Sequence, residues 1–202
     1  MIRYILAVLF IGGVAGYLNN NFWNVISDVW VSSYLFDVSL LLLLFFMGLS
    51  FGSNRDAITK MKRTGLKILI VPFLVALGTI LAGFLGGLIF QLDSTASMAA
   101  TAGYGWYTLA GPLVGQIFGP EWGMLGFTVN FLRELFTIVT VSLMFKVDKY
   151  APIASGGATT MDTTLPVIVR YCGSDALMTA FASGFTLSII APFSILAIAS
   201  LR

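Results

Sequence analysis

The stretch ASGGATTMDTTLP, residues 154–166, is rich in Gly, Ser and Thr and carries one acid, Asp162. It belongs to a chain of 202 residues that is 58% hydrophobic and only 10% charged, with a mean hydropathy of +0.94. A soluble domain averages about 25% charged residues. The composition therefore predicts a polytopic membrane protein, and the polar stretch has to be explained at membrane depth.

Five apolar segments approach or exceed the ~20 residues that cross a ~30 Å hydrocarbon core. Two of them carry glycine pairs with GxxxG spacing, Gly12 with Gly16 and Gly83 with Gly87, which favours close helix packing. The first segment has no cleavage motif and is expected to be a retained helix. The predicted spans are residues 2–18, 29–51, 66–90, 121–145 and 174–201.

Charge bias orients these spans. The loop of residues 52–67 holds Arg55, Lys60, Lys62, Arg63 and Lys67 against a single acid. Basic loops stay on the cytoplasmic side, so the N-terminus is predicted to be cytoplasmic and the C-terminus to lie outside. The expected location is the cytoplasmic (inner) membrane of a bacterium or archaeon.

Two odd segments, residues 97–118 and 154–173, match each other at a shift of 54 residues. We interpret residues 97–145 and 154–201 as repeat units within a single transport domain, residues 1–202. The matched pairs are Gly103 with Gly157, Pro112 with Pro166, Gly119 with Gly173, Glu121 with Asp175, and Phe127 with Phe181.

The odd segments either cross the membrane or enter it and return. Re-entry keeps the loop with Lys146 and Lys149 cytoplasmic, and it makes the two units an inverted repeat, as in many secondary transporters. Non-helical backbone at this depth needs protein or water partners, which explains the small and hydroxylated residues. Pro112 and Pro166 fit the first turn of short half-helices, whose free N–H groups would favour an anion such as a carboxylate. Two ordinary external loops are the alternative.

The predicted fold is therefore an all-α membrane protein with about five transmembrane helices and two re-entrant half-helix segments. Arg133 and Glu134 lie near the middle of the fourth span. A central charge costs about 2.5–3.5 kcal/mol on insertion scales, so such groups face a cavity or a partner. Asn130 and Thr137 share the helical face of Glu134, whereas Arg133 is turned by about 100° and could instead pair with an acid on another segment.

Two further acids are candidates. Asp162 could face the same cavity as Glu134, or cap a half-helix that begins near Thr163. Asp37 lies close to the outer end of the second span, where it could simply sit at the interface.

Aromatic side chains are concentrated in the first odd segment, where Tyr104, Trp106 and Tyr107 alternate with glycines that include Gly105. Trp and Tyr commonly anchor proteins at the membrane interface. In a cavity their faces would also suit an organic cation, at about 0.5–2 kcal/mol.

Four stretches together resemble the lysine exporter LysO family. They are AGYGWYTLAG (102–111), NFLRELFTIV (130–139), GGATTMDTTLPVIVRY (156–171) and SLLLLLFFMGLSFGSNRDAI (39–58). The resemblance implies an inner-membrane exporter of L-lysine and toxic lysine analogues that needs intramembrane acids, with Glu134 as the match in the RE motif. Longer family members carry extra N-terminal spans, so a homodimer or a small membrane partner subunit is a hypothesis for supplying what those spans contribute.

These features predict a secondary transporter that exports lysine, with Glu134 binding the substrate ammonium and a proton in turn, so that lysine exit is coupled to proton entry. Na⁺ is the alternative coupling ion. The alternatives are an ion-coupled carrier of another solute, such as a carboxylate held by Arg133, and a non-transporting membrane scaffold. An enzyme is not expected, since there is no His and the single cysteine, Cys172, has no evident base nearby in sequence. The small net charge of +2 does not suggest nucleic acid, and no cofactor or metal is predicted. The candidate site residues are Glu134, Asp162, Arg133, Asn130, Tyr104, Gly105, Trp106, Tyr107, Thr160, Thr163 and Asp37.

Overall fold

The computed structural model describes residues 69–202 without a gap. Before them it describes only residues 10–12, 14–19, 21, 34, 38, 41, 42, 45, 46, 49 and 53. The chain divides into two compact units, Met1–Arg55 and Asp56–Arg202. The predicted first two spans and the basic loop lie largely outside the described residues, and so does Asp37. The helices α4 to α10 and the candidate site belong to the second unit.

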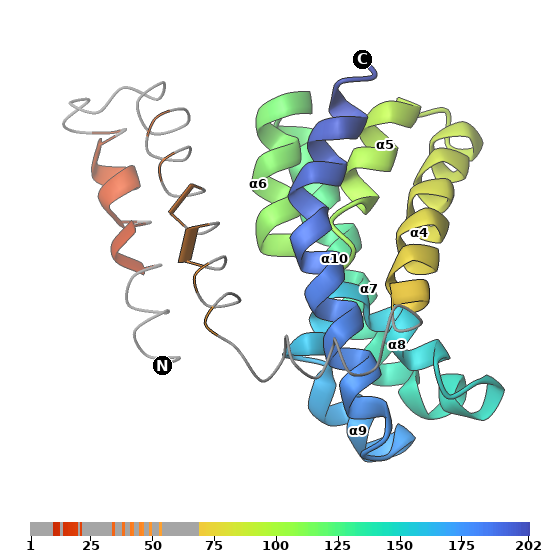
Figure 1. The fold of residues 1–202 in the computed structure, drawn as a ribbon. Helices are drawn as coiled ribbons and strands as arrows, with labels where there is room; N and C mark the ends of the chain where they lie inside the picture. The colour runs from red at the N-terminus through yellow and green to blue at the C-terminus, as the bar shows by residue number, and fades with distance from the viewer. Residues whose placement is uncertain are drawn as a thin grey trace. The chain divides into compact units, whose positions relative to one another are not determined.

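Three helices of this unit are long and apolar enough to cross a membrane, α4 (Ile70–Ile89), α7 (Pro120–Val147) and α10 (Ala176–Ala199). They match the third, fourth and fifth predicted spans. All elements in the described part of this unit are helical, which confirms the all-α prediction. Figure 1 shows α10 running between α6 on one side and α4 and α5 on the other.

Both odd segments are interrupted helices. The first consists of α5 (Ser94–Thr101), a non-helical break at residues 102–106, and α6 (Tyr107–Phe118). The second consists of α8 (Ala151–Gly156), the 3₁₀ turn η4 (Gly157–Met161), and α9 (Leu165–Cys172) after a short break. The interruption of both segments, as the Gly-rich sequences indicated, is therefore present.

The two prolines differ in position. Pro166 lies in the first turn of α9, as predicted, where its missing N–H removes no helical hydrogen bond. The prediction for Pro112 is wrong, because α6 already begins at Tyr107 and Pro112 lies inside it. The reason is that residues 107–111 continue the helix toward its N-terminus, so α6 has 12 residues and α9 only 8.

The same order of elements occurs twice, a short helix, a break, a second short helix and then a long helix. Each second short helix ends at a glycine with positive φ, Gly119 (φ 106°, ψ 164°) and Gly173 (φ 83°, ψ 169°). These are the residues that the 54-residue shift aligned. The likeness in element order supports a structural repeat.

Small residues let the helices approach closely. A Cβ on Gly83 of α4 would meet Thr101 Oγ1 and lie 2.9 Å from the Ser97 carbonyl oxygen, and one on Gly87 would lie 2.9 Å from Ser94 Cα. The second predicted glycine pair therefore packs α4 against α5, as expected for this spacing.

The two breaks meet inside the unit. The Ala158 N–H of the second break donates a hydrogen bond of 2.8 Å to the Tyr104 carbonyl of the first. A Cβ on Gly105 would lie 3.1 Å from the Gly156 carbonyl oxygen, and one on Gly157 would collide with the Tyr104 carbonyl oxygen. The glycines are thus needed because two stretches of backbone touch here without side chains between them.

Candidate functional site

A polar stripe runs along the buried face of α7. Asn130 is 1%, Glu134 9% and Thr137 1% exposed, as their shared helical face predicted. The Thr137 hydroxyl donates to the Arg133 carbonyl at 2.8 Å and lies 2.7 Å from the Ser155 hydroxyl. The stripe therefore faces the two breaks and not the exposed apolar side of the helix.

Glu134 is the acid at the centre of this stripe. Within the part of the chain that the structure describes, its Oε2 atom is buried and has no hydrogen-bond partner. Buried polar atoms are almost always paired, and an unpaired one costs about 1–3 kcal/mol. An unpaired carboxylate oxygen at this depth is therefore a candidate acceptor for a cation or a proton that comes and goes.

Tyr107, the first residue of α6, lies beside Glu134. Its phenol is close enough to Glu134 for a side-chain hydrogen bond. The Tyr107 ring meets Phe127 and Phe131 edge to face, with ring centroids 5.2 and 5.6 Å away. Glu134 and a cluster of aromatic rings are thus brought together where α6 packs against α7.

Asp162 does not cap α9, so that alternative is wrong. Its Oδ1 accepts hydrogen bonds from the backbone N–H of Thr163 at 2.5 Å and from the Thr163 hydroxyl at 3.3 Å. The residue at the N-cap is Thr164, and its side chain makes no capping hydrogen bond. Because α9 starts at Leu165, two residues later than predicted, Asp162 precedes the N-cap position by two residues and cannot cap the helix. Its side chain is exposed.

Asn130 supports backbone. Its Oδ1 accepts from the Gly105 N–H at 2.7 Å, and its Nδ2 donates to the carbonyls of Ala100 at 2.8 Å and Gly126 at 2.7 Å. The side-chain amide is thereby engaged on both of its polar atoms. Asn130 and Gly105 together fix the shape of the first break, and neither presents a spare polar group to a substrate in this conformation.

Arg133 binds backbone as well. Its Nε donates to the Ser155 carbonyl at 2.7 Å, its Nη2 to the Ala154 carbonyl at 2.9 Å, and its Nη1 to the Thr79 hydroxyl at 3.0 Å. The predicted alternative, an ion pair with an acid on another segment, is not among these described contacts. The guanidinium instead links α7 to α4 and to the end of α8.

The remaining predicted residues divide between core and surface. The Tyr104 side chain is fully buried, near Ser194 of α10, and its φ is 54°. Trp106 is half-buried, and its indole N–H donates to the Thr108 hydroxyl at 3.0 Å. The fully buried Thr160 hydroxyl donates to the carbonyls of Gly157 and Ala180, both at 2.7 Å, so it ties η4 to α10.

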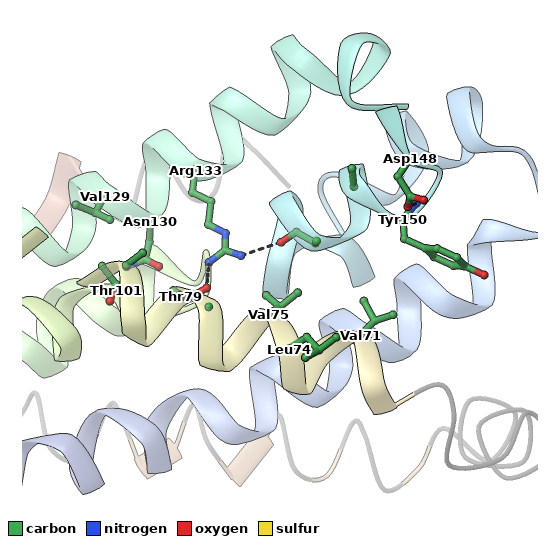
Figure 2. Close-up of a pocket in the computed structure, with 14 residues that line it drawn as sticks. Val71, Leu74, Val75, Thr79, Thr101, Val129, Asn130, Arg133, Asp148 and Tyr150 are labelled. Atoms are coloured by element: carbon green, nitrogen blue, oxygen red, sulfur yellow. Dashed lines mark hydrogen bonds between the residues drawn. The ribbon is translucent and has the colours of Figure 1, made fainter. Parts of the chain in front are cut away.

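Arg133 also borders a groove of about 750 Å³ between α4, α7 and the start of α8 (Figure 2). Figure 2 shows the guanidinium reaching from α7 toward Thr79, with Val71, Leu74 and Val75 further along α4. The described lining is mostly aliphatic, and Glu134 and Tyr107 lie outside it. Arg133 and Glu134, although adjacent in sequence, thus serve different surroundings.

Sequence reasoning missed Thr79 and Ser155, which share in holding Arg133 and Thr137. A signal for Thr79 exists, because it is the one hydroxyl residue in the apolar run IVPFLVALGTILAGFLGGLI of α4. It also missed Phe127 and Phe131, which read as ordinary lipid-facing residues of α7 and are 43% and 41% exposed.

Three apolar helices of membrane-spanning length, two interrupted helices that touch at their breaks, and a buried acid beside them define an integral membrane protein built on discontinuous helices. The model of the lysine exporter LysO family matches residues 6–199, and the chain belongs to that family.

Two curated relatives extend this finding. The chain is 32% identical over 161 residues to the lysine exporter LysO of Escherichia coli K12, covering 79% of this chain and 53% of that protein. It is 24% identical over 155 residues to a putative lysine exporter of Haemophilus influenzae Rd, covering 76% of this chain and 78% of that protein. The chain thus spans about half the length of the E. coli relative. No solved structure matches it. The family is one of transporters and not of enzymes.

Proposed function

We propose that this chain is a secondary transporter that exports L-lysine and lysine analogues across the cytoplasmic membrane, in exchange for entering protons. The observation that carries the proposal is the buried Oε2 of Glu134, which has no partner among the described residues. Membership of the lysine exporter family and the names of both relatives support lysine as the substrate.

The chemistry of the site fits lysine. At neutral pH lysine carries two ammonium groups and one carboxylate, so it needs at least one acid in a pocket that excludes water. Glu134 supplies a buried carboxylate, and Asp162, which is exposed directly after η4, supplies a second one. The rings of Tyr107, Phe127 and Phe131 offer aromatic faces to the substrate, which favour a cation when they are desolvated.

Proton exchange follows from competition for one carboxylate. If Glu134 holds either a substrate ammonium or a proton, each outward passage of lysine must be followed by return of the protonated acid. The described residues around Glu134 provide a hydrogen-bonding phenol but no fixed cation bonded to it, which leaves the carboxylate free to bind both ligands in turn. Na⁺ in place of the proton is the other coupling ion that we predicted.

The two interrupted helices supply a means of alternating access. We propose that they re-enter the membrane from opposite sides as an inverted repeat, among five crossing helices of which α4, α7 and α10 are three. The repeated element order and the aligned Gly119 and Gly173 support this arrangement. Movement of one repeat unit against the other at the Tyr104–Ala158 contact would open the site to each side of the membrane in turn.

The proposed orientation places the N-terminus in the cytoplasm and the C-terminus outside. A homodimer or a small membrane subunit belongs to the proposal, because Asp162 and part of Tyr107 remain exposed. Covering that surface would enclose the acids. Full transport by the purified chain as a monomer would remove this part of the proposal.

The central test is lysine counterflow in proteoliposomes. Glu134→Gln keeps the size of the side chain but removes its charge and its proton exchange, so we expect counterflow to fall to background while insertion and folding are retained. Glu121→Gln is the matched control, because Glu121 is an exposed acid in the first turn of the same helix. We expect that variant to transport within twofold of wild type.

Lysine transport by Glu134→Gln at the wild-type rate would refute the assignment of Glu134. If a pH gradient drives no lysine movement but a Na⁺ gradient does, the carrier remains and the coupling ion changes. Competition by other amino acids and by small carboxylates in the same vesicles then defines the substrate range.

A further inference from the structure

We infer that Arg133 is a positioning residue, which holds the second break against the first and so fixes where Asp162 lies relative to Glu134. This inference rests on the proposed lysine transport only for its kinetic test. It differs from our expectation from the sequence, in which Arg133 bound a substrate anion or an acid.

The first step concerns where the guanidinium binds. The carbonyls of Ala154 and Ser155 belong to the last turn of α8, where carbonyl groups lack helical partners and carry the negative end of the helix dipole. A planar guanidinium can donate to two such carbonyls at once from adjacent nitrogens, which an ammonium group cannot do with the same geometry. Arg133 thus completes the end of α8 at the point where the chain leaves the helix.

The next step follows the chain into the break. Gly157 comes directly after α8 with φ 62°, and a Cβ on it would lie 3.1 Å from Arg133 Cζ. Ala158 then donates its N–H to the Tyr104 carbonyl. The guanidinium therefore lies beside the glycine that lets the two breaks touch, and it fixes the peptide that enters that contact.

The position of Asp162 depends on this arrangement. Asp162 follows η4 directly, and η4 begins at Gly157 beside Arg133. Arg133 and Glu134 are neighbours on the rigid helix α7, so a second break tied to Arg133 is also held at a set place relative to Glu134. Tyr104 supplies the carbonyl group that accepts the Ala158 hydrogen bond, and Tyr107 follows Tyr104 by three residues.

A role as a substrate anion clamp is disfavoured by the surroundings of Arg133. Three of its five N–H groups already donate hydrogen bonds, to Ser155, Ala154 and Thr79. The groove that it borders is lined mostly by aliphatic side chains, as Figure 2 shows along α4. Neither Glu134 nor Tyr107 lines that groove.

Thr79 makes the inference testable without touching the charge. Thr79→Val removes the acceptor of Nη1 and keeps the side-chain shape, whereas Thr79→Ser retains the hydroxyl. We expect Thr79→Val to lower the maximal rate of lysine export about fivefold and Arg133→Lys more than tenfold, with KM for lysine within twofold of wild type. Thr79→Ser should recover most of the rate. Cadaverine, which is lysine without its carboxylate, should compete equally well in all variants.

A second measurement does not depend on the substrate. In a Cys172→Ser background, Thr163→Cys places a thiol beside Asp162 at an exposed position. If Arg133 holds the second break, adding Thr79→Val or Arg133→Lys should change the rate of labelling by a water-soluble thiol reagent at least fivefold. Adding Thr79→Ser should leave that rate unchanged.

Three outcomes would overturn the inference. A KM for lysine that rises more than tenfold in Arg133→Lys, with cadaverine inhibition unchanged, would make Arg133 a ligand of the substrate carboxylate. Unchanged labelling in both Thr79→Val and Arg133→Lys would show that the second break is held without Arg133. Full activity per folded molecule with only a lower melting temperature would leave Arg133 a general stabiliser. If wild type moves no lysine, the proposed function fails, and the labelling rates still decide the role of Arg133.

Discussion

The two breaks solve the same problem with different side chains. In the first, one neutral amide, Asn130 of α7, accepts from Gly105 and donates to Ala100 and Gly126. In the second, a guanidinium and hydroxyls share the work, with Arg133 holding the end of α8 and Thr160 tying η4 to α10. Both arrangements satisfy backbone groups that lipid would leave unpaired.

The difference lies in how widely each break is connected. The first is held by one side chain, Asn130 of α7, besides the backbone bond from Ala158. The second has side-chain ties to two helices, α7 through Arg133 and α10 through Thr160, and Arg133 is itself held by Thr79 of α4. We therefore expect the stability of the first break to depend heavily on one side chain. In the second break, removing one support should leave the others in place.

The largest effect is expected where the two breaks touch. Gly157→Ala would place a Cβ on the Tyr104 carbonyl oxygen and also force a positive φ on a residue with a side chain. We expect a loss of about 4 kcal/mol or more in the free energy of unfolding, from strain and steric overlap together. Thermal unfolding of the purified protein in detergent measures this loss of stability.

Gly173→Ala is the control for this variant. Gly173 also has a positive φ, of 83°, but a Cβ there would meet nothing within 4 Å. Only the backbone penalty of about 1–3 kcal/mol should remain. Equal losses in the two variants would show that contact between the breaks contributes nothing to stability.

The next effect is that of Asn130→Ala. It leaves the buried Gly105 N–H without its acceptor and removes two further hydrogen bonds, so we expect a loss of about 3 kcal/mol. Thr128→Ala on the exposed side of the same helix should change stability by less than about 0.5 kcal/mol. A loss below 1 kcal/mol for Asn130→Ala would contradict single-residue support of the first break.

Much of this fold could be predicted from the sequence because lipid imposes simple requirements. Span length and hydropathy located α4, α7 and α10 to within a few residues. Gly and Thr at 154–166 predicted an interruption, since small residues allow close backbone approach and hydroxyls supply local partners at that depth. The start of α6 could not be predicted, because Pro112 is tolerated inside the helix as well as at its first turn.

The site was predictable only where one helix carries the information. The shared face of Asn130, Glu134 and Thr137 follows from their spacing along α7. The partners of Arg133 lie 21, 22 and 54 residues away, and no local pattern encodes such contacts. The burial of Tyr104 was missed for a similar reason, because its positive φ is set by the meeting of the two breaks.

A smaller effect is expected for Thr160→Val, which tests the distributed support of the second break. The hydroxyl is fully buried and shares its proton between two carbonyls, on η4 and on α10. Because Arg133 and the Ala158 contact remain, we expect a loss of about 1 kcal/mol. Thr140→Val, which removes only a bond to Phe136 within α7, should cost less. A loss as large as that of Asn130→Ala would mean that the two breaks are equally dependent on one residue.

The smallest effect is expected for Thr164→Val. The Thr164 and Thr159 hydroxyls lie 3.2 Å apart, but Thr159 also donates to the Gly156 carbonyl at 2.9 Å and keeps that bond. Thr164 occupies the N-cap of α9 without a capping hydrogen bond, so no cap is lost. We expect a change below about 0.5 kcal/mol, against about 1 kcal/mol for Asp93→Ala, which removes the hydrogen bond from the Ala96 N–H that caps α5. A larger loss for Thr164→Val than for Asp93→Ala would show that Thr164 caps α9 in another conformation of the second break. The second break would then have a support that the present conformation lacks.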